Sequence, residues 1–248
     1  EASQLAWEFV DAANAANARA VFYGVSAANL ALWAEMGLSM HKMGEEAVVP
    51  LSSFTLDGSG PKKLRTAFNR AGRDGLSFEL LQAPIDDPTM NELRNISDQW
   101  LFDKQSSEKQ FSVGRFDPEY LRLFPIAIVR HGGRIVAFAN VLTTGLKQTA
   151  TIDLMRHVSD APSGLMDYLF TALMLHLKSD GYITFSLGMA PLAGLETRRG
   201  SRWTMKLGGL IYRHGGHFYN FDGLRNFKDK FDPDWQPRFL VASSRTSI

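Results

Sequence analysis

The stretch PIAIVRHGGRIVAFANVLTTGLKQTATIDLMRHV, residues 125–158, decides the fold class. It contains three runs rich in β-branched and apolar residues, which is typical of strands. The first two runs are joined by His131-Gly132-Gly133, and glycine tolerates the positive φ angles of a tight hairpin. The stretch therefore predicts three consecutive antiparallel strands.

Downstream of this stretch, helix and strand signals alternate. Pro162-Ser163-Gly164 precedes an apolar helical run, YITFSLG (residues 182–188) indicates a strand, and PRFLVAS (residues 237–243) indicates a last strand after a further helical segment. Three antiparallel strands followed by helix, strand, helix and strand form an α+β order that is typical of acetyltransferase-like folds.

The first part of the chain repeats this order incompletely. It predicts helices over 2–18, 26–33, 61–73 and 87–104 and strands over 18–25, 38–51 and 76–83. We therefore expect two acetyltransferase-like modules with mixed, mostly antiparallel sheets. Residues 1–84 form the first, incomplete at its N-terminal edge, and residues 85–248 form the second, which carries the catalytic residues.

Composition excludes several classes of protein. The 248 residues include no cysteine, which rules out disulfides and thiolate metal sites, and the net charge is only +1. An anionic partner must therefore be bound by local basic patches. The longest apolar run, Leu165 to Leu177, is too short for a transmembrane helix of about 20 residues. The apolar residues of this run predict a core helix, with an acyl-chain groove as the alternative.

Cofactor and metal motifs are missing. The chain has no phosphate-binding P-loop and no dinucleotide fingerprint. Acetyl-coenzyme A users of this fold need a glycine-rich loop at a helix N-terminus, but VSDAPSG (residues 158–164) has one glycine and no basic residue. His214 and His217 lack a carboxylate at third-ligand spacing, which favours a turn. We expect neither a cofactor nor a metal.

Asp153 and Arg156 lie close together in the third strand of the decisive stretch. Strict alternation places Arg156 on one face of the strand and Asp153 on the other. The two side chains share a face only if a bulge intervenes, and bulges occur next to active sites. An ordinary ion pair at a strand edge is the alternative interpretation.

Two segments concentrate positive charge. The helix predicted over 61–73 carries basic residues and no acid, namely Lys62, Lys63, Arg65, Arg70 and Arg73. It suits tRNA or an anionic membrane surface, although a solvated surface helix would look the same. Residues 198–238 mix cations with aromatic rings, which suits an unpaired tRNA end or a core packed with aromatics.

The strings GMAPLAGL (residues 188–195) and HFYNFDGLRNFKDKFDPDWQPRFLVA (residues 217–242) resemble the C-terminal signature of the bacterial phosphatidylglycerol lysyl- and alanyltransferases, the multiple peptide resistance factor family. The resemblance extends through FYGVS (residues 22–26), GEEAVVPLSSFTLDG (residues 44–58) and TIDLMRH (residues 151–157). It covers nearly the whole chain.

This resemblance implies that lysine or alanine is transferred from aminoacyl-tRNA to the glycerol headgroup of phosphatidylglycerol, conferring resistance to cationic antimicrobial peptides. It also implies a preceding transmembrane flippase domain and a location on the cytoplasmic side of the bacterial inner membrane. The ester of charged tRNA is already activated, so no cofactor is required.

Site residues follow from the same resemblance. The implied catalytic residues are Asp153, Arg156, Glu196 and Lys228, and Arg225, Tyr219 and the basic helix are implied to bind substrate. Asp153 or Glu196 would assist removal of the acceptor proton, Arg156 would hold the lipid phosphate and Lys228 would neutralise charge at the carbonyl or the departing ribose oxygen. Packing is the alternative role for Tyr219.

Two alternative functions stay open. Transferases that modify peptidoglycan precursors also take amino acids from charged tRNA and use similar tandem modules. A non-catalytic module that binds tRNA or membrane is the second alternative.

Overall fold

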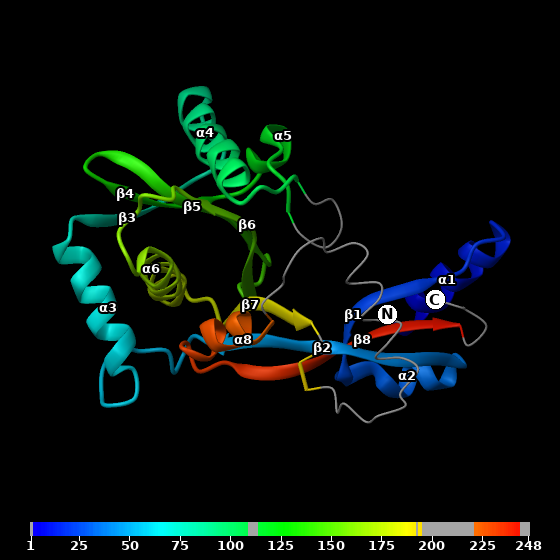
Figure 1. Ribbon diagram of the computed structural model, residues 1–248. Helices are drawn as coiled ribbons and strands as arrows, with labels where there is room; N and C mark the ends of the chain where they lie inside the picture. Colours follow the sequence, from blue (N-terminus) through cyan, green and yellow to red (C-terminus); the bar gives the residue numbers. More distant parts are fainter. Residues whose placement is uncertain (1, 109–113, 192, 195–220, 244–248) are drawn as a thin grey trace. The chain divides into compact units, whose positions relative to one another are not determined.

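The computed structural model describes residues 2–108, 114–191, 193–194 and 221–243 (Figure 1). The chain forms two units. The first contains residues 1–47, 189–229 and 233–248, and the second contains residues 48–188 and 230–232. Strands β2 (Leu38–Pro50) and β7 (Thr184–Pro191) each run from one unit into the other along the chain.

The second unit is built on a sheet with the strand order β7-β6-β5-β4-β3. Its remaining strands are β3 (Leu76–Leu81), β4 (Ile126–His131), β5 (Arg134–Thr143) and β6 (Thr149–His157). Neighbouring strands from β3 to β6 are antiparallel, and β6 pairs with β7 in parallel. The three predicted antiparallel strands and the α+β class with mostly antiparallel strands are confirmed.

The hairpin between β4 and β5 forms where the sequence predicts it. Gly132 and Gly133 link the strands with φ angles of 58° and 84°. A residue with a Cβ atom rarely adopts these angles, which explains why two glycines stand here.

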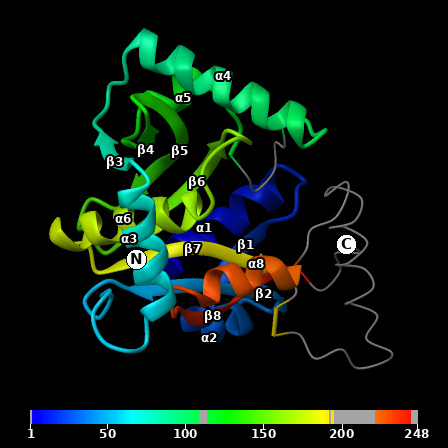
Figure 2. The same cartoon turned by 60° about the vertical axis from the view of Figure 1, so that its left-hand side comes forward.

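Helices cover both faces of this sheet (Figures 1 and 2). One face carries α4 (Asp87–Asp103) and α5 (Pro118–Leu121), and the other carries α6 (Leu165–Ser179). Helix α3 (Lys62–Arg73) packs on α6, where the rings of Phe68 and Tyr168 stack with centroids 5.0 Å apart. Covering both faces explains why the central strands are continuously apolar.

The core of this unit lies between the helices and the sheet. Ile128 and Phe138 from the sheet are completely buried, as are Leu93 of α4 and Leu169 of α6. Along α6, Phe170, Met174 and Leu177 are also buried, which agrees with a core helix rather than a groove.

The first unit is smaller and has the strand order β1-β8-β2. Its elements are α1 (Ala2–Ala15), β1 (Val21–Ser26), a 3-10 turn (Ala27–Asn29), α2 (Leu30–Glu35), the start of β2, α8 (Phe221–Asp229) and β8 (Asp234–Ser243). Strands β1 and β8 are antiparallel. Trp33 and Val241 are buried in a small apolar core with Ala6.

The units do not follow the boundary predicted at residue 84, because residues 48–84 belong to the second unit and 189–229 to the first. The division into two acetyltransferase-like modules, residues 1–84 and 85–248, stays a prediction. No helix in the described part of the chain is long and apolar enough to span a bilayer.

Candidate functional site

Two clusters of residues contain the predicted catalytic residues that the structure describes. The bulge cluster, in the second unit, consists of Asp153, Arg156, Tyr120, Glu108 and Trp100. The lysine cluster, in the first unit, consists of Lys228 and Met189 with the charged residues Glu46, Arg238, Glu45, Arg225 and Lys42.

A β-bulge in β6 shapes the bulge cluster. Ala139 of β5 pairs with Met155, but Val141 pairs with Ile152, so three steps along β6 match two along β5. The extra residue lies at Asp153 and Leu154. Their backbone N–H groups both donate to Oδ1 of the buried Asn140, at 3.2 Å and 2.7 Å.

The Asp153 carboxylate lies against Tyr120 of α5 and against Gly114, which precedes that helix. The Tyr120 hydroxyl of α5 donates to Asp153 Oδ2 at 3.4 Å. A Cβ atom added to Gly114 would lie 2.6 Å from the same oxygen, so only glycine leaves room for the carboxylate. Burial, followed by the charge of Asp153, raises the pKa of Tyr120, which keeps this hydroxyl protonated.

Arg156 is only 7% exposed, and its guanidinium contacts three partners. Its guanidinium carbon lies 4.3 Å from the centroid of the Trp100 ring in α4. One nitrogen donates to Glu108 Oε2 at 3.2 Å, and another donates to the carbonyl of Met155 at 3.0 Å. A buried guanidinium needs such partners to offset its desolvation.

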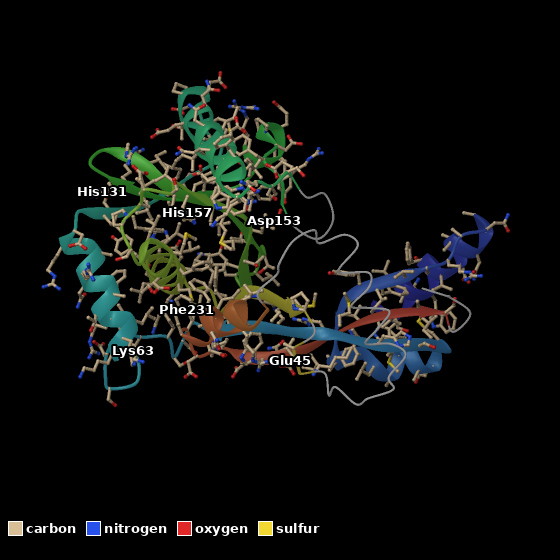
Figure 3. The ribbon with its side chains drawn as sticks, viewed as in Figure 1. Glu45, Lys63, His131, Asp153, His157 and Phe231 are labelled. Carbon is tan, nitrogen blue, oxygen red and sulfur yellow. The ribbon has the colours of Figure 1, made fainter. Side chains whose placement is uncertain are left out.

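Strand alternation left open whether the side chains of Asp153 and Arg156 share a face of β6, and the bulge decides this. Asp153 contacts Tyr120 and Arg156 contacts Trp100 and Glu108, so both side chains meet the segment 100–120. A carboxylate partner of Arg156 comes from this segment, 48 positions away in sequence. Figure 3 shows Asp153 on β6.

Lys228 is the central residue of the lysine cluster. It lies on α8, is 5% exposed, and donates from Nζ to the carbonyl oxygen of Met189 on β7 at 3.0 Å. Burial lowers its pKa from the ordinary value of 10.5 to about 8, and the charge of Glu46 opposes part of that shift. Glu46 also contacts Arg238 of β8.

Glu45 accepts hydrogen bonds from two cations of the same cluster. Lys42 Nζ lies 2.8 Å from one carboxylate oxygen, and an Arg225 nitrogen lies 3.1 Å from the other. The bond from Lys42 is the largest of the causes that lower the pKa of Glu45. The Arg225 guanidinium also lies 4.4 Å from the centroid of the Trp235 ring. Figure 3 shows Glu45 on β2.

The basic residues of α3 fall into two groups. Lys62, Lys63 and Arg73 are exposed, and Figure 3 shows Lys63 on this helix. Arg65 donates from one nitrogen to the carbonyls of Leu56 and Gly58, at 2.6 Å and 2.7 Å, and so ties down the preceding loop. Arg70 lies 3.4 Å from Asp74 in an exposed pair.

Two predicted site residues, Glu196 and Tyr219, lie outside the described residues, as do His214 and His217. Among the residues that are described, no group of three or more His, Cys, Asp or Glu side chains could hold a metal ion.

A cavity of about 270 Å³ opens at the N-terminus of α6. His157, Ser159 and Gly164 line it together with Asp167 and Lys230. Both carboxylate oxygens of Asp167 accept hydrogen bonds from Lys230 Nζ at 2.9 Å. The cation beside this helix terminus is therefore already paired with an acid. The arrangement does not favour an anion such as a pyrophosphate.

Sequence reasoning did not identify Glu45, Glu46, Glu108, Tyr120 or Asn140. Glu45 and Glu46 stand in GEEAVVPLSSFTLDG, one of the strings that carry the resemblance, and that string was the available signal. Nothing in the local pattern around the other three residues marks them, because their partners lie 8 to 48 positions away.

Comparisons with known proteins identify relatives over nearly the whole chain. Residues 1–242 match the family model described as phosphatidylglycerol lysyltransferase, C-terminal. The phosphatidylglycerol lysyltransferase of Bacillus subtilis (strain 168) is 39% identical over 242 residues, which is 97% of this chain and 28% of that protein. The chain therefore spans under a third of this relative's length.

Two solved structures are similar over nearly the whole chain. A C-terminal domain from Agrobacterium fabrum, described as part of a lysylphosphatidylglycerol synthetase, is 44% identical with a TM-score of 0.84, covering 98% of this chain and 73% of that one. L-PGS from Bacillus licheniformis is 34% identical with a TM-score of 0.83, covering 99% and 74%. The chain belongs to the phosphatidylglycerol lysyltransferase C-terminal family.

Proposed function

We propose that this chain transfers an aminoacyl group from charged tRNA to the glycerol headgroup of phosphatidylglycerol. The family match over residues 1–242 carries this proposal, because it includes both clusters. The relatives are named for lysine, so lysine is the donor we favour. Alanine is the alternative that the sequence leaves open.

The chemistry is an ester exchange. A glycerol hydroxyl oxygen attacks the carbonyl carbon of the aminoacyl ester, a new C–O bond forms, and the bond to the ribose oxygen breaks. The proton lost by the glycerol hydroxyl ends on that ribose oxygen. The protein must align two anionic substrates, stabilise the oxyanion and move this proton.

We assign Lys228 to the charge that develops at the carbonyl or at the departing ribose oxygen. Its hydrogen bond to Met189 fixes the position of Nζ, and burial strengthens its interaction with an anion. With a pKa of about 8, the ammonium can also give up a proton near neutral pH. Both properties support a catalytic role.

Within the bulge cluster, we assign Asp153 to removal of the acceptor proton and Arg156 to the lipid phosphate. The hydrogen bond from Tyr120 orients the Asp153 carboxylate. Arg156 is already paired with Glu108, so a phosphate would have to share or displace that carboxylate. Glu196 is the alternative base.

For the large substrates, we assign the exposed residues Lys62, Lys63 and Arg73 of α3 to the tRNA backbone. Arg65 supports the loop before this helix instead of binding directly. The resemblance implies that Arg225 binds substrate; because it donates a hydrogen bond to Glu45, we assign it instead to positioning that carboxylate. Tyr219 is proposed to line the pocket for the tRNA acceptor end.

The rest of the protein is part of the same proposal. The chain spans 28% of the Bacillus subtilis relative, and we propose a membrane flippase domain in the remainder, with this region on the cytoplasmic side of the inner membrane. Adding lysine places positive charge on an anionic headgroup. This would weaken the attraction of cationic antimicrobial peptides to the membrane.

A single assay tests this function. Radiolabelled lysyl-tRNA and alanyl-tRNA are offered separately to the chain with phosphatidylglycerol vesicles and, in parallel, with a lipid-linked peptidoglycan precursor. We expect label from lysyl-tRNA in phosphatidylglycerol. Label only in the precursor would replace our proposal with the peptidoglycan alternative, and tRNA or vesicle binding without any transfer would favour a non-catalytic module.

A further inference from the structure

Asn140 is a polar residue inside an otherwise apolar strand. The residues of β5 from Ile135 to Val141 are all buried, and the others among them are Val, Ala, Phe or Ile. Asn140 itself is 0% exposed. A buried amide costs free energy unless its hydrogen bonds are made, so its presence in this strand needs a reason.

The amide is bonded on one side only. Oδ1 accepts from the backbone N–H groups of Asp153 and Leu154, which identifies this atom as the oxygen. Nδ2 has no hydrogen-bond partner within the part of the chain that the structure describes. An orphaned donor makes Asn140 a poor choice for stability alone.

The two hydrogen bonds that Asn140 Oδ1 accepts stabilise the bulge. In a regular antiparallel ladder every second N–H group of β6 points to β5 and finds a backbone carbonyl there, so no side-chain acceptor would be needed. At the bulge, two residues of β6 face one residue of β5, and the oxygen of Asn140 takes the N–H groups that the ladder leaves.

We infer that Asn140 is a positioning residue, which holds the bulge and thereby turns the Asp153 carboxylate toward Tyr120 and onto the face that Arg156 occupies. Without the bulge, the period of two in a strand would place Asp153 and Arg156 on opposite faces. The catalytic consequence rests on the proposed role of Asp153. The structural consequence does not.

The structural consequence is tested on this chain with Asn140→Leu and Asn140→Asp. Asn140→Leu removes the acceptor at similar volume, so we expect faster amide hydrogen exchange at Asp153 and Leu154 and loss of the Tyr120 contact in a crystal structure. Asn140→Asp keeps an acceptor and should retain the bulge. An unchanged bulge in Asn140→Leu, or its loss in Asn140→Asp, overturns the inference.

Thr171→Val provides a matched control. Thr171 is also 0% exposed, and its hydroxyl likewise lacks a hydrogen-bond partner among the described residues, but it lies on α6. This variant should leave exchange at Asp153 and Leu154 unchanged. If it accelerates exchange there as much as Asn140→Leu does, the effect is general loosening and the inference fails.

The catalytic consequence is tested by combining substitutions in the transfer assay. A misplaced catalytic group can cost on the order of 10²-fold, so Asn140→Leu should lower kcat by about that factor with little change in KM. In an Asp153→Asn background the same substitution should have little further effect, whereas multiplying effects would indicate two independent roles. Normal kcat in Asp153→Asn alone would refute the proposed role of Asp153, while hydrogen exchange would still decide the role of Asn140.

Discussion

Lys228 donates a hydrogen bond from Nζ to the carbonyl oxygen of Met189 at 3.0 Å, and its side chain is 5% exposed. The two residues are 39 positions apart in sequence, and both belong to the first unit. A lysine buried to this extent and held by a main-chain carbonyl has a defined position, which is what stabilisation of a developing charge requires.

Substituting Lys228 should abolish most of the transfer activity. Loss of one preorganised donor to an oxyanion typically costs on the order of 10²- to 10³-fold in kcat, so Lys228→Ala should fall in this range. The measurement is the rate of lysine transfer to phosphatidylglycerol, with circular dichroism to establish folding. Lys230→Ala is the control, because Lys230 pairs with Asp167 in the second unit. Near-normal turnover in folded Lys228→Ala would remove Lys228 from the mechanism.

The buried Lys228 should also make stability depend on pH. The unfolded chain keeps this proton up to the ordinary pKa of 10.5, whereas the folded chain releases it near a pKa of about 8. Between these values the unfolded state binds more protons, so stability rises with pH, and the burial penalty is present in full below about pH 8.

Lys228→Met removes this titration while keeping the shape. The variant should therefore gain stability over the wild-type chain below about pH 8, and the gain should shrink by about 3 kcal/mol as the pH rises toward 10.5. Urea unfolding of both proteins across this range measures the difference, in which all other titrating groups cancel. A difference that does not vary with pH would contradict the lowered pKa.

Gly114→Ala should reduce activity without unfolding the chain. The new Cβ would lie 2.6 Å from Asp153 Oδ2, so the carboxylate must move away from its place beside Tyr120. We expect kcat to fall by about 10-fold or more, since small displacements of a catalytic group are costly. Gly145→Ala is a suitable control, because a Cβ atom there meets nothing within 4 Å. Equal effects of both substitutions would show that backbone flexibility, not the position of Asp153, matters.

Reversing charge on α3 should weaken tRNA binding. Lys62→Glu with Lys63→Glu removes two exposed cations, so affinity should fall and its dependence on salt should decrease by about one per lost phosphate contact. Titration of fluorescent tRNA at several salt concentrations measures both quantities. Lys104→Glu, an exposed residue at the end of α4, is compared with Lys63→Glu alone, because both single variants change the net charge equally. A similar loss in that variant would mean that α3 has no special part in binding.

Local sequence patterns were sufficient for most elements of the fold, although they missed α5 and the 3-10 turn at Ala27–Asn29 that precedes α2. The basic helix predicted over 61–73 spans Lys62–Arg73, and the helix predicted over 87–104 spans Asp87–Asp103. Both have clear signals: a proline opens the first, and Asp86 caps the second by accepting from the Thr89 N–H at 2.9 Å. Such signals depend on residues within one turn of each other, so they can be read along the chain.

The partners of the candidate site residues could not be derived in this way. Strand alternation placed Asp153 and Arg156 on opposite faces unless a bulge intervened, and the acceptor that holds the bulge is 13 positions away. The ion pair between Arg225 and Glu45 joins residues 180 positions apart. No periodicity encodes a contact at that separation.

The sequence by itself therefore determined the α+β class, the three antiparallel strands, the turn at Gly132-Gly133 and the presence of Asp153, Arg156 and Lys228 in the motifs that carry the family resemblance. Tertiary structure alone decided that Lys228 is buried against Met189, that Arg156 pairs with Glu108, and that Asn140 holds the bulge at Asp153. The physical reason is that burial and hydrogen bonding depend on which distant segments meet, and these set the pKa and the orientation of a side chain.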